Sequence, residues 1–134
     1  MRAFTLPALL IGLLLAAPSV LASGGGGFQA PGYLPLDPPF VLNVSAPKGV
    51  HFMQIKVQAY VETEEAALTV QHHMPAIRNS LIMLFSGRSM EEANTVEARE
   101  QWRAEALAEV QHLLEGLSGQ PGVSELFFTD FIVQ

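Results

Sequence analysis

The histidines are the first side chains with which this chain could do chemistry. His72 and His73 are adjacent, so on a helix their side chains point about 100 degrees apart and cannot chelate one metal as an i, i+4 pair does. His51 and His112 are far away in the sequence, and neither has a carboxylate at ligand spacing. These spacings predict surface or packing histidines and no metal site.

A second candidate for chemistry is a group of carboxylates in one segment: Glu91, Glu92, Glu97 and Glu100. Arg99 and Arg103 lie at salt-bridge spacing to them, which favours a solvated, ion-paired face over an acid–base cluster. The serines have no nucleophile-elbow setting, and the glycines at 24–27 precede no helix that could hold phosphate. Without cysteine there is no thiol chemistry and no disulfide. The sequence therefore predicts a protein that is not an enzyme and has no cofactor.

The charge of the chain bears on its partners. The 134 residues have a formal net charge of -6, and the 7 basic residues are scattered. Because phosphate binding needs a basic stripe, nucleic acid is not a predicted partner. The composition is typical of a single small domain that holds itself together by burying an apolar core.

Residues 1–22 predict export from the cytoplasm. Arg2 precedes an apolar run at 6–15, and Ala22 ends a Val-Leu-Ala sequence at which signal peptidase would cut. The apolar stretch 3–22 is also long enough to cross a bilayer. Two alternatives follow: a cleaved signal peptide that leaves a soluble periplasmic protein, or an uncleaved anchor in the inner membrane.

The next residues predict a linker and then strands. Residues 23–32 are expected to form a flexible, glycine-rich linker. The proline-rich segment 33–40 should be extended, lying either along the sheet edge of its own domain or on a partner. From Met53 to Glu62 apolar and polar residues alternate without a break, which predicts a half-buried antiparallel strand.

Helices should follow this strand. Thr63 is a predicted N-cap for a helix that ends near His73. Pro75 then predicts either a kink or a second helix with proline in its first turn. This second segment, up to Phe85, is apolar almost all round. Such a surface predicts burial against the sheet or an oligomer interface.

The last third of the chain predicts a long helix and a final strand. Ser89 and Thr95 are predicted caps, the second for an amphipathic helix over 96–115. Its apolar stripe contains Trp102, Ala106, Val110, Leu113, Leu114 and Leu117. Residues 123–133 are apolar on both faces, which predicts a strand in the centre of the sheet. The predicted fold class is α+β, a small antiparallel sheet with two to three helices packed on one side.

Five segments, in this order, resemble the FliL family of flagellar basal-body accessory proteins. They are 33–43 (YLPLDPPFVLN), the alternating strand at 53–62, 73–81 (HMPAIRNSL), 103–106 (RAEA) and 126–134 (LFFTDFIVQ). The resemblance covers 33–134 and implies a periplasmic domain comparable with stomatin and prohibitin (SPFH) modules. It also implies homo-oligomeric rings around the linker and plug region of the stator, the MotA and MotB complex, in support of swimming, swarming and chemotaxis.

The predicted contacts of such a protein lie in two segments, 38–44 and 74–85. The candidate interface residues for self-assembly and for stator binding are Pro38, Pro39, Phe40, Val41, Asn43, Met74, Ile77, Leu81 and Leu84. Two alternatives remain beside this reading. One is a soluble periplasmic binding or scaffolding module of the same family that is not tied to motility, and the other is an unrecognised hydrolase.

Overall fold

A computed structural model describes residues 27–134 of the chain. The predicted signal peptide or anchor at 1–22 and the first residues of the predicted linker lie outside this part. Within it, the elements follow in the order β1 (Gly32–Pro35), β2 (Phe40–Val44), β3 (His51–Val61), α1 (Glu64–His72), α2 (Met74–Phe85), α3 (Met90–Ala93), α4 (Val96–Ser118) and β4 (Glu125–Val133).

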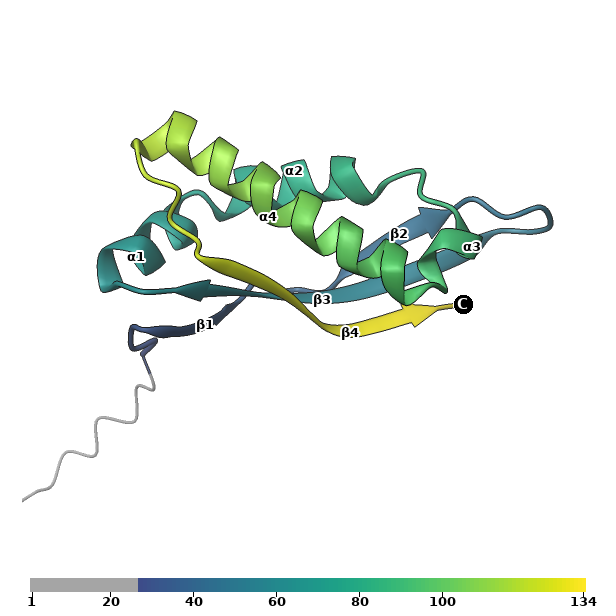
Figure 1. Cartoon of the computed structure of the whole chain (residues 1–134), viewed down its shortest axis with the longest axis horizontal. Helices are drawn as coiled ribbons and strands as arrows, with labels where there is room; N and C mark the ends of the chain where they lie inside the picture. Colours follow the sequence, from purple (N-terminus) through teal and green to yellow (C-terminus); the bar gives the residue numbers. More distant parts are fainter. Residues whose placement is uncertain (1–26) are drawn as a thin grey trace, which may run out of the picture.

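The molecule has two layers, a twisted sheet and a layer of helices on one of its faces (Figure 1). All strand pairs are antiparallel. The predicted α+β class with helices on one side is confirmed, and the helical layer contains the one-turn α3 in addition to α1, α2 and α4. The likeness to stomatin modules stays a prediction.

Strand β3 is the centre of the sheet. β1 pairs with the second half of β3, β2 pairs with its first half, and β4 pairs with residues of both halves. Because a strand has only two edges, β1 and β2 share one edge of β3 and β4 takes the other. The predicted alternation in β3 is confirmed, since its buried residues are Met53, Ile55, Val57, Ala59 and Val61.

The last strand is at the edge of the sheet, so the prediction of a central strand was wrong. In the described part of the chain β4 pairs only with β3. Its register shifts at a bulge, where Lys56 pairs with Asp130 and Val57 with Phe128, leaving Thr129 as the extra residue. The bulge explains the apolar residues on both faces, because it returns Phe131 to the helix-covered face occupied by Phe128.

Local capping accounts for the helix starts. Thr63 Oγ1 accepts a hydrogen bond from the amide of Ala66 at 3.0 Å, and Thr95 Oγ1 accepts one from the amide of Ala98 at 3.2 Å. Both predicted caps are confirmed. Of the two alternatives at Pro75, the second is observed, because α2 is a separate helix with this proline in its first turn.

The core lies between the sheet and the helices. Its largest fully buried side chains include Trp102 from α4, Phe85 from α2 and Phe40 from β2. The predicted stripe of α4 is buried at Trp102, Ala106, Val110 and Leu114, whereas Leu113 is half-buried. Leu117 was predicted wrongly, since it is 50% exposed on the last turn, beyond the end of the sheet-facing stripe.

Candidate interaction surface

Three of the predicted interface residues lie in the core of the domain. Phe40 is 1% exposed, and Ile77 and Leu81 are fully buried. Phe40 packs edge-to-face on Phe85, with ring centroids 6.2 Å apart. In the single chain these side chains support the fold and present no surface to a partner.

The two predicted interface segments pack on each other. Arg78 of α2 donates through Nη1 to the carbonyls of Leu36 at 2.7 Å and Pro38 at 2.6 Å, and its guanidinium lies 4.2 Å from the centre of the Phe40 ring. The amide of Leu36 also donates to the carbonyl of Val57 at 2.9 Å. The proline-rich segment therefore lies along its own sheet, which is one of the two alternatives that the sequence left open.

Other predicted interface residues reach the surface. Val41 is 62% exposed, Pro38 and Asn43 are also exposed, and Pro39, Met74 and Leu84 are half-buried. On α2 the sequence missed Met83, which is 70% exposed beside Leu84. A groove of about 530 Å³ separates α2 from α4 here, lined by Ala76, Asn79, Ser80, Met83, Leu84, Glu109 and Leu113.

The face of the sheet without helices carries several exposed apolar residues. We call this the outer face, and its exposed apolar residues are Tyr33, Val41, Phe52, Phe127 and Ile132. In the register of the sheet, Val41 and Ile132 lie on opposite sides of Gln54, two residues from Phe52. The sequence placed Gln54 and its alternate neighbours on a polar face. It missed this surface because the apolar residues come from four strands and meet only in the sheet.

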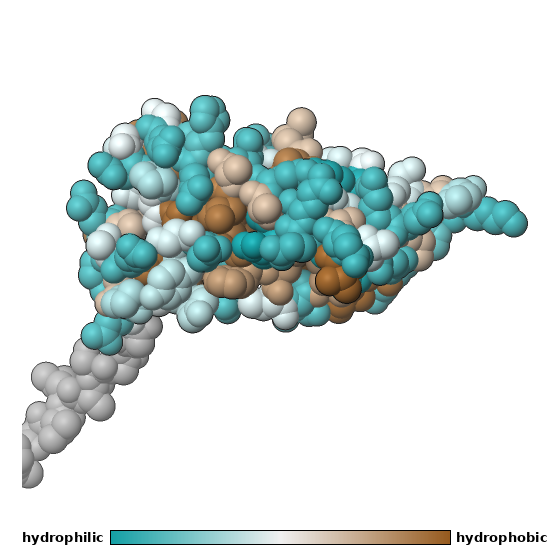
Figure 2. Space-filling model, in the orientation of Figure 1, coloured by the Kyte–Doolittle hydropathy of each residue, from teal (hydrophilic) through white to brown (hydrophobic). Residues whose placement is uncertain are grey.

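Aromatic rings cluster at one end of the outer face. The ring of Tyr33 lies 5.2 Å from that of Tyr60 and 5.8 Å from that of Phe127, both edge-to-face. Lys56 Nζ and Asp130 Oδ2 form an ion pair at 3.8 Å between this cluster and the Val41 end. The side of the molecule seen in Figure 2 is largely hydrophilic, with smaller hydrophobic areas.

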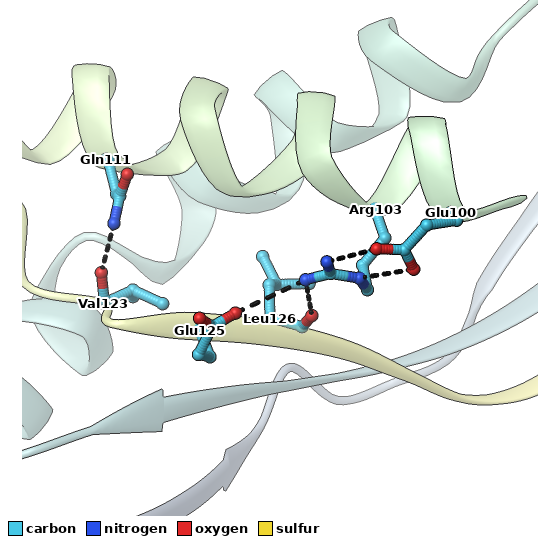
Figure 3. Close-up of polar contacts among 6 residues, drawn as sticks. All are labelled: Glu100, Arg103, Gln111, Val123, Glu125 and Leu126. Atoms are coloured by element: carbon cyan, nitrogen blue, oxygen red, sulfur yellow. Dashed lines mark hydrogen bonds and ion pairs between the residues drawn. The ribbon is translucent and has the colours of Figure 1, made fainter.

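Two arginines on the helical side of the sheet, Arg88 and Arg103, form ion pairs with glutamates. Arg88 pairs with Glu105, and this hydrogen bond holds the pKa of the Glu105 carboxyl below its usual range. Arg103 pairs with Glu100 and Glu125, as Figure 3 shows, and its hydrogen bonds lower the pKa of Glu100. The predicted ion-paired face is thus present at Glu100, and it also reaches β4 through Glu125.

The histidines lie apart from one another except for the adjacent pair. The rings of His72 and His73 are edge-to-face with centroids 4.7 Å apart, and His51 donates through Nε2 to the carbonyl of Lys48 at 2.8 Å. Across residues 27–134 no three histidine or carboxylate side chains are grouped so that they could hold a metal ion.

The sequence of this domain matches that of a known family. Residues 33–134, from β1 to the end of β4, match the family described as "Flagellar basal body-associated protein FliL". The chain belongs to the FliL family. The resemblance of the sequence to the FliL family is therefore confirmed.

A relative supports the assignment to FliL. The chain is 31% identical over 99 residues to "Flagellar protein FliL" of Aquifex aeolicus (strain VF5). The matched part is 74% of this chain and 59% of the relative, so the chain spans about three fifths of the length of this FliL protein. FliL proteins are a flagellar basal-body-associated family, so the chain is assigned to an accessory family and not to a family of enzymes.

The described helices were also compared with the requirements for crossing a membrane. None of the helices within residues 27–134 has the length and apolar composition needed to cross a bilayer.

Proposed function

We propose that this protein is a non-enzymatic accessory component of the flagellar basal body. In this proposal it self-assembles in the periplasm into a ring and supports a stator of the MotA and MotB type. The observation that carries the proposal is the FliL match over 33–134, which spans every described strand and helix. The role in swimming, swarming and chemotaxis follows from the same proposal.

The outer face supports self-assembly. Exposed apolar residues that gather on one face of a protein can mark an interaction site, whereas single ones scattered over a surface are normal. Here Val41 and Phe52 project from neighbouring strands on a face that no described element covers. Val41 and Asn43 also belong to the predicted interface, and both are exposed on β2. We infer that these strands contribute to the contact between copies.

Motility of a deletion strain tests the flagellar role. Loss of the protein should impair swimming in viscous medium and swarming, and the natural chain should restore both. A double variant, Val41→Thr with Phe52→Thr, should not restore them, because threonine keeps the strand propensity and reduces the apolar area that these two side chains expose. Leu68→Gln is the matched control, since Leu68 is 65% exposed on α1, away from the outer face. Normal motility of the deletion strain under load would overturn the flagellar role.

The size of the assembly distinguishes the two functional readings. Light scattering should show an oligomer for the natural chain and a smaller species for the double variant, with unchanged circular dichroism. If the natural chain forms an oligomer but its deletion leaves motility unchanged, the alternative function, a scaffolding module that is not tied to the flagellum, is favoured. Cross-linking to MotA and MotB type subunits in intact cells should depend on the same outer face.

Export and attachment belong to the same proposal. Residues 3–22 attach the domain to the inner membrane if they are kept, and cleavage after Ala22 releases it into the periplasm. The intact mass of the protein extracted from the cell envelope decides between these forms, because a mature chain that begins at Ser23 lacks the whole apolar segment. Recovery of the protein only from the cytoplasm would overturn both.

A further inference from the structure

One edge of β4 is free. Phe52 and Gln134 exchange two backbone hydrogen bonds of 2.8 Å each, so they are a hydrogen-bonded pair of the β3 and β4 ladder. Such pairs alternate along an antiparallel ladder, and the amide and carbonyl groups of the residues between them point away from the partner strand. Phe131 and Val133 therefore direct their backbone groups outward. Within residues 27–134 these groups make no hydrogen bond.

The first part of the same edge is closed by α4. Arg103 Nη1 donates to the carbonyl of Leu126 at 3.2 Å, and Gln111 Nε2 donates to the carbonyl of Val123, two residues before the strand begins, at 2.8 Å (Figure 3). Side chains that cover an edge in this way prevent another strand from pairing with it. The open edge thus consists of the residues after the bulge, from Phe131 to Val133.

A groove runs along β4, mostly beside the part that α4 closes, and it reaches the open edge at Phe131. Its volume is about 760 Å³, and it is lined by Val96, Arg99, Glu100, Arg103, Glu125, Phe127, Phe128 and Phe131. Phe127 lies on the outer face and Phe128 on the helix-covered face, so the groove follows the edge between the two faces. An extended peptide, whose side chains alternate between faces, matches this shape.

The groove contains an arginine that is free to bind a carboxylate. Arg99 Nε donates to the carbonyl of Ala93 at 2.6 Å, and its guanidinium lies 4.1 Å from the centre of the Phe131 ring. Arg103, in the same groove, is paired with two glutamates, whereas Arg99 pairs with no carboxylate in the described part of the chain. Its terminal nitrogens are therefore available for a charge-assisted hydrogen bond next to the open edge.

We propose that the open edge of β4 binds an extended segment of a partner protein as a fifth strand. The segment carries an acidic side chain that pairs with Arg99 and apolar side chains that pack on Phe131 and Val96. The acidic side chain must lie on the helix-covered face, where Arg99 packs on Phe131. A second copy of β4 has no acidic residue there, because its own residues on that face of the open edge, Phe131 and Val133, are apolar. The inference rests on the edge and the groove, and it goes beyond the proposed flagellar function.

Binding of designed peptides to the full chain tests the proposal. The probe is a fluorescein-labelled peptide of about ten residues, within the usual length range of strands, in which every second residue is threonine and the residues between them are valines with one central glutamate. One face of this peptide then carries both the glutamate for Arg99 and the valines for Phe131 and Val96. Fluorescence anisotropy should show saturable binding, and amide hydrogen exchange at Phe131 and Val133 should slow. The same peptide with lysine in place of glutamate should bind at least about tenfold more weakly, the effect of one charge-assisted hydrogen bond. No saturation below about 1 mM would overturn the proposal.

Two pairs of variants separate the backbone contact from the charge. Val133→Pro removes an amide that points away from β3, a position where edge strands tolerate proline, and it should weaken binding at least about tenfold relative to Val133→Ala. Arg99→Gln should weaken binding of the glutamate peptide, and Arg99→Lys should retain most of it. Equal binding by the members of either pair would contradict the proposal. So would exchange at Phe131 and Val133 that slows with protein concentration alone, because a second copy would then occupy the edge.

Discussion

Replacement of Arg78 by leucine should destabilise the domain by about 3.5 kcal/mol. The variant loses two charge-assisted hydrogen bonds, to the carbonyls of Leu36 and Pro38, and the contact with the ring of Phe40. Each hydrogen bond to a charged group contributes about 1.5 to 3 kcal/mol, and the cation–π contact about 0.5 to 1 kcal/mol. The lower ends of these ranges apply, because Arg78 is half-buried and water reaches part of the site.

The free energy of unfolding of Arg78→Leu can be measured in urea with the full chain. The chain has a single tryptophan, Trp102, which is 2% exposed, so its fluorescence reports the loss of the core. Arg78→Lys is the matched control, because one ammonium keeps the charge but lacks the planar fork that serves two carbonyls and the ring. The free energy of unfolding of Arg78→Lys should lie between those of the natural chain and Arg78→Leu. A loss below about 0.5 kcal/mol for Arg78→Leu would refute the reasoning, since surface substitutions have effects of that size.

Three further predictions concern α2 and the Glu105 ion pair. Leu81→Asp should abolish the folded circular dichroism signal, because it removes a fully buried side chain, at about 2 to 5 kcal/mol, and buries an unpaired charge. Met83→Asp should leave the fold intact, because Met83 is exposed. A smaller particle in light scattering would then place Met83 in a contact between copies, and an unchanged oligomer would show that Met83 is not in such a contact. The hydrogen bond from Arg88 lowers the pKa of Glu105, so this ion pair contributes about 1 kcal/mol to the free energy of unfolding. The contribution is complete above about pH 4.5, the pKa in the unfolded chain, and it is lost as the pH falls through the lowered pKa of the folded state. Urea unfolding of Glu105→Gln across pH 2 to 7 should lack this part of the pH dependence, and an unaltered profile would contradict the assignment.

Local patterns in the sequence predicted the parts of the fold that depend on neighbouring residues. The alternation in β3 and the caps at Thr63 and Thr95 act over a few residues, and they appear as predicted. The edge position of β4 could not be predicted in this way. It depends on which edge of β3 is already occupied by β1 and β2, and that pairing joins residues far apart in the sequence. The apolar residues on both faces of β4, which suggested a central strand, result from the bulge at Thr129.

The same distinction applies to the candidate surface. The sequence indicated that 38–44 and 74–85 are unusually apolar, but it could not separate core from surface. Arg78 joins these segments across 42 residues, and this contact buries Phe40 rather than exposing it. The outer face was missed because its members, such as Tyr33 and Phe127, are distant in sequence and adjacent only in the sheet. The sequence did contain a sign of the bulge in β4. Phe128 and Phe131 are three residues apart, whereas residues on the same face of a regular strand are an even number of residues apart.

The pairing of β4 with β3 affects the order in which the chain completes its fold. Val133 pairs with Met53, which precedes it by about 80 residues, and the intervening chain supplies all the described helices. Until β4 pairs with β3, one edge of the central strand is open to solvent, and so is Leu126 of β4, which is fully buried in the completed fold. An incomplete chain, whether still being synthesised or shortened by a protease, would present this edge to other molecules as a site for aggregation. Removal of the last strand should therefore yield insoluble protein rather than a smaller folded domain.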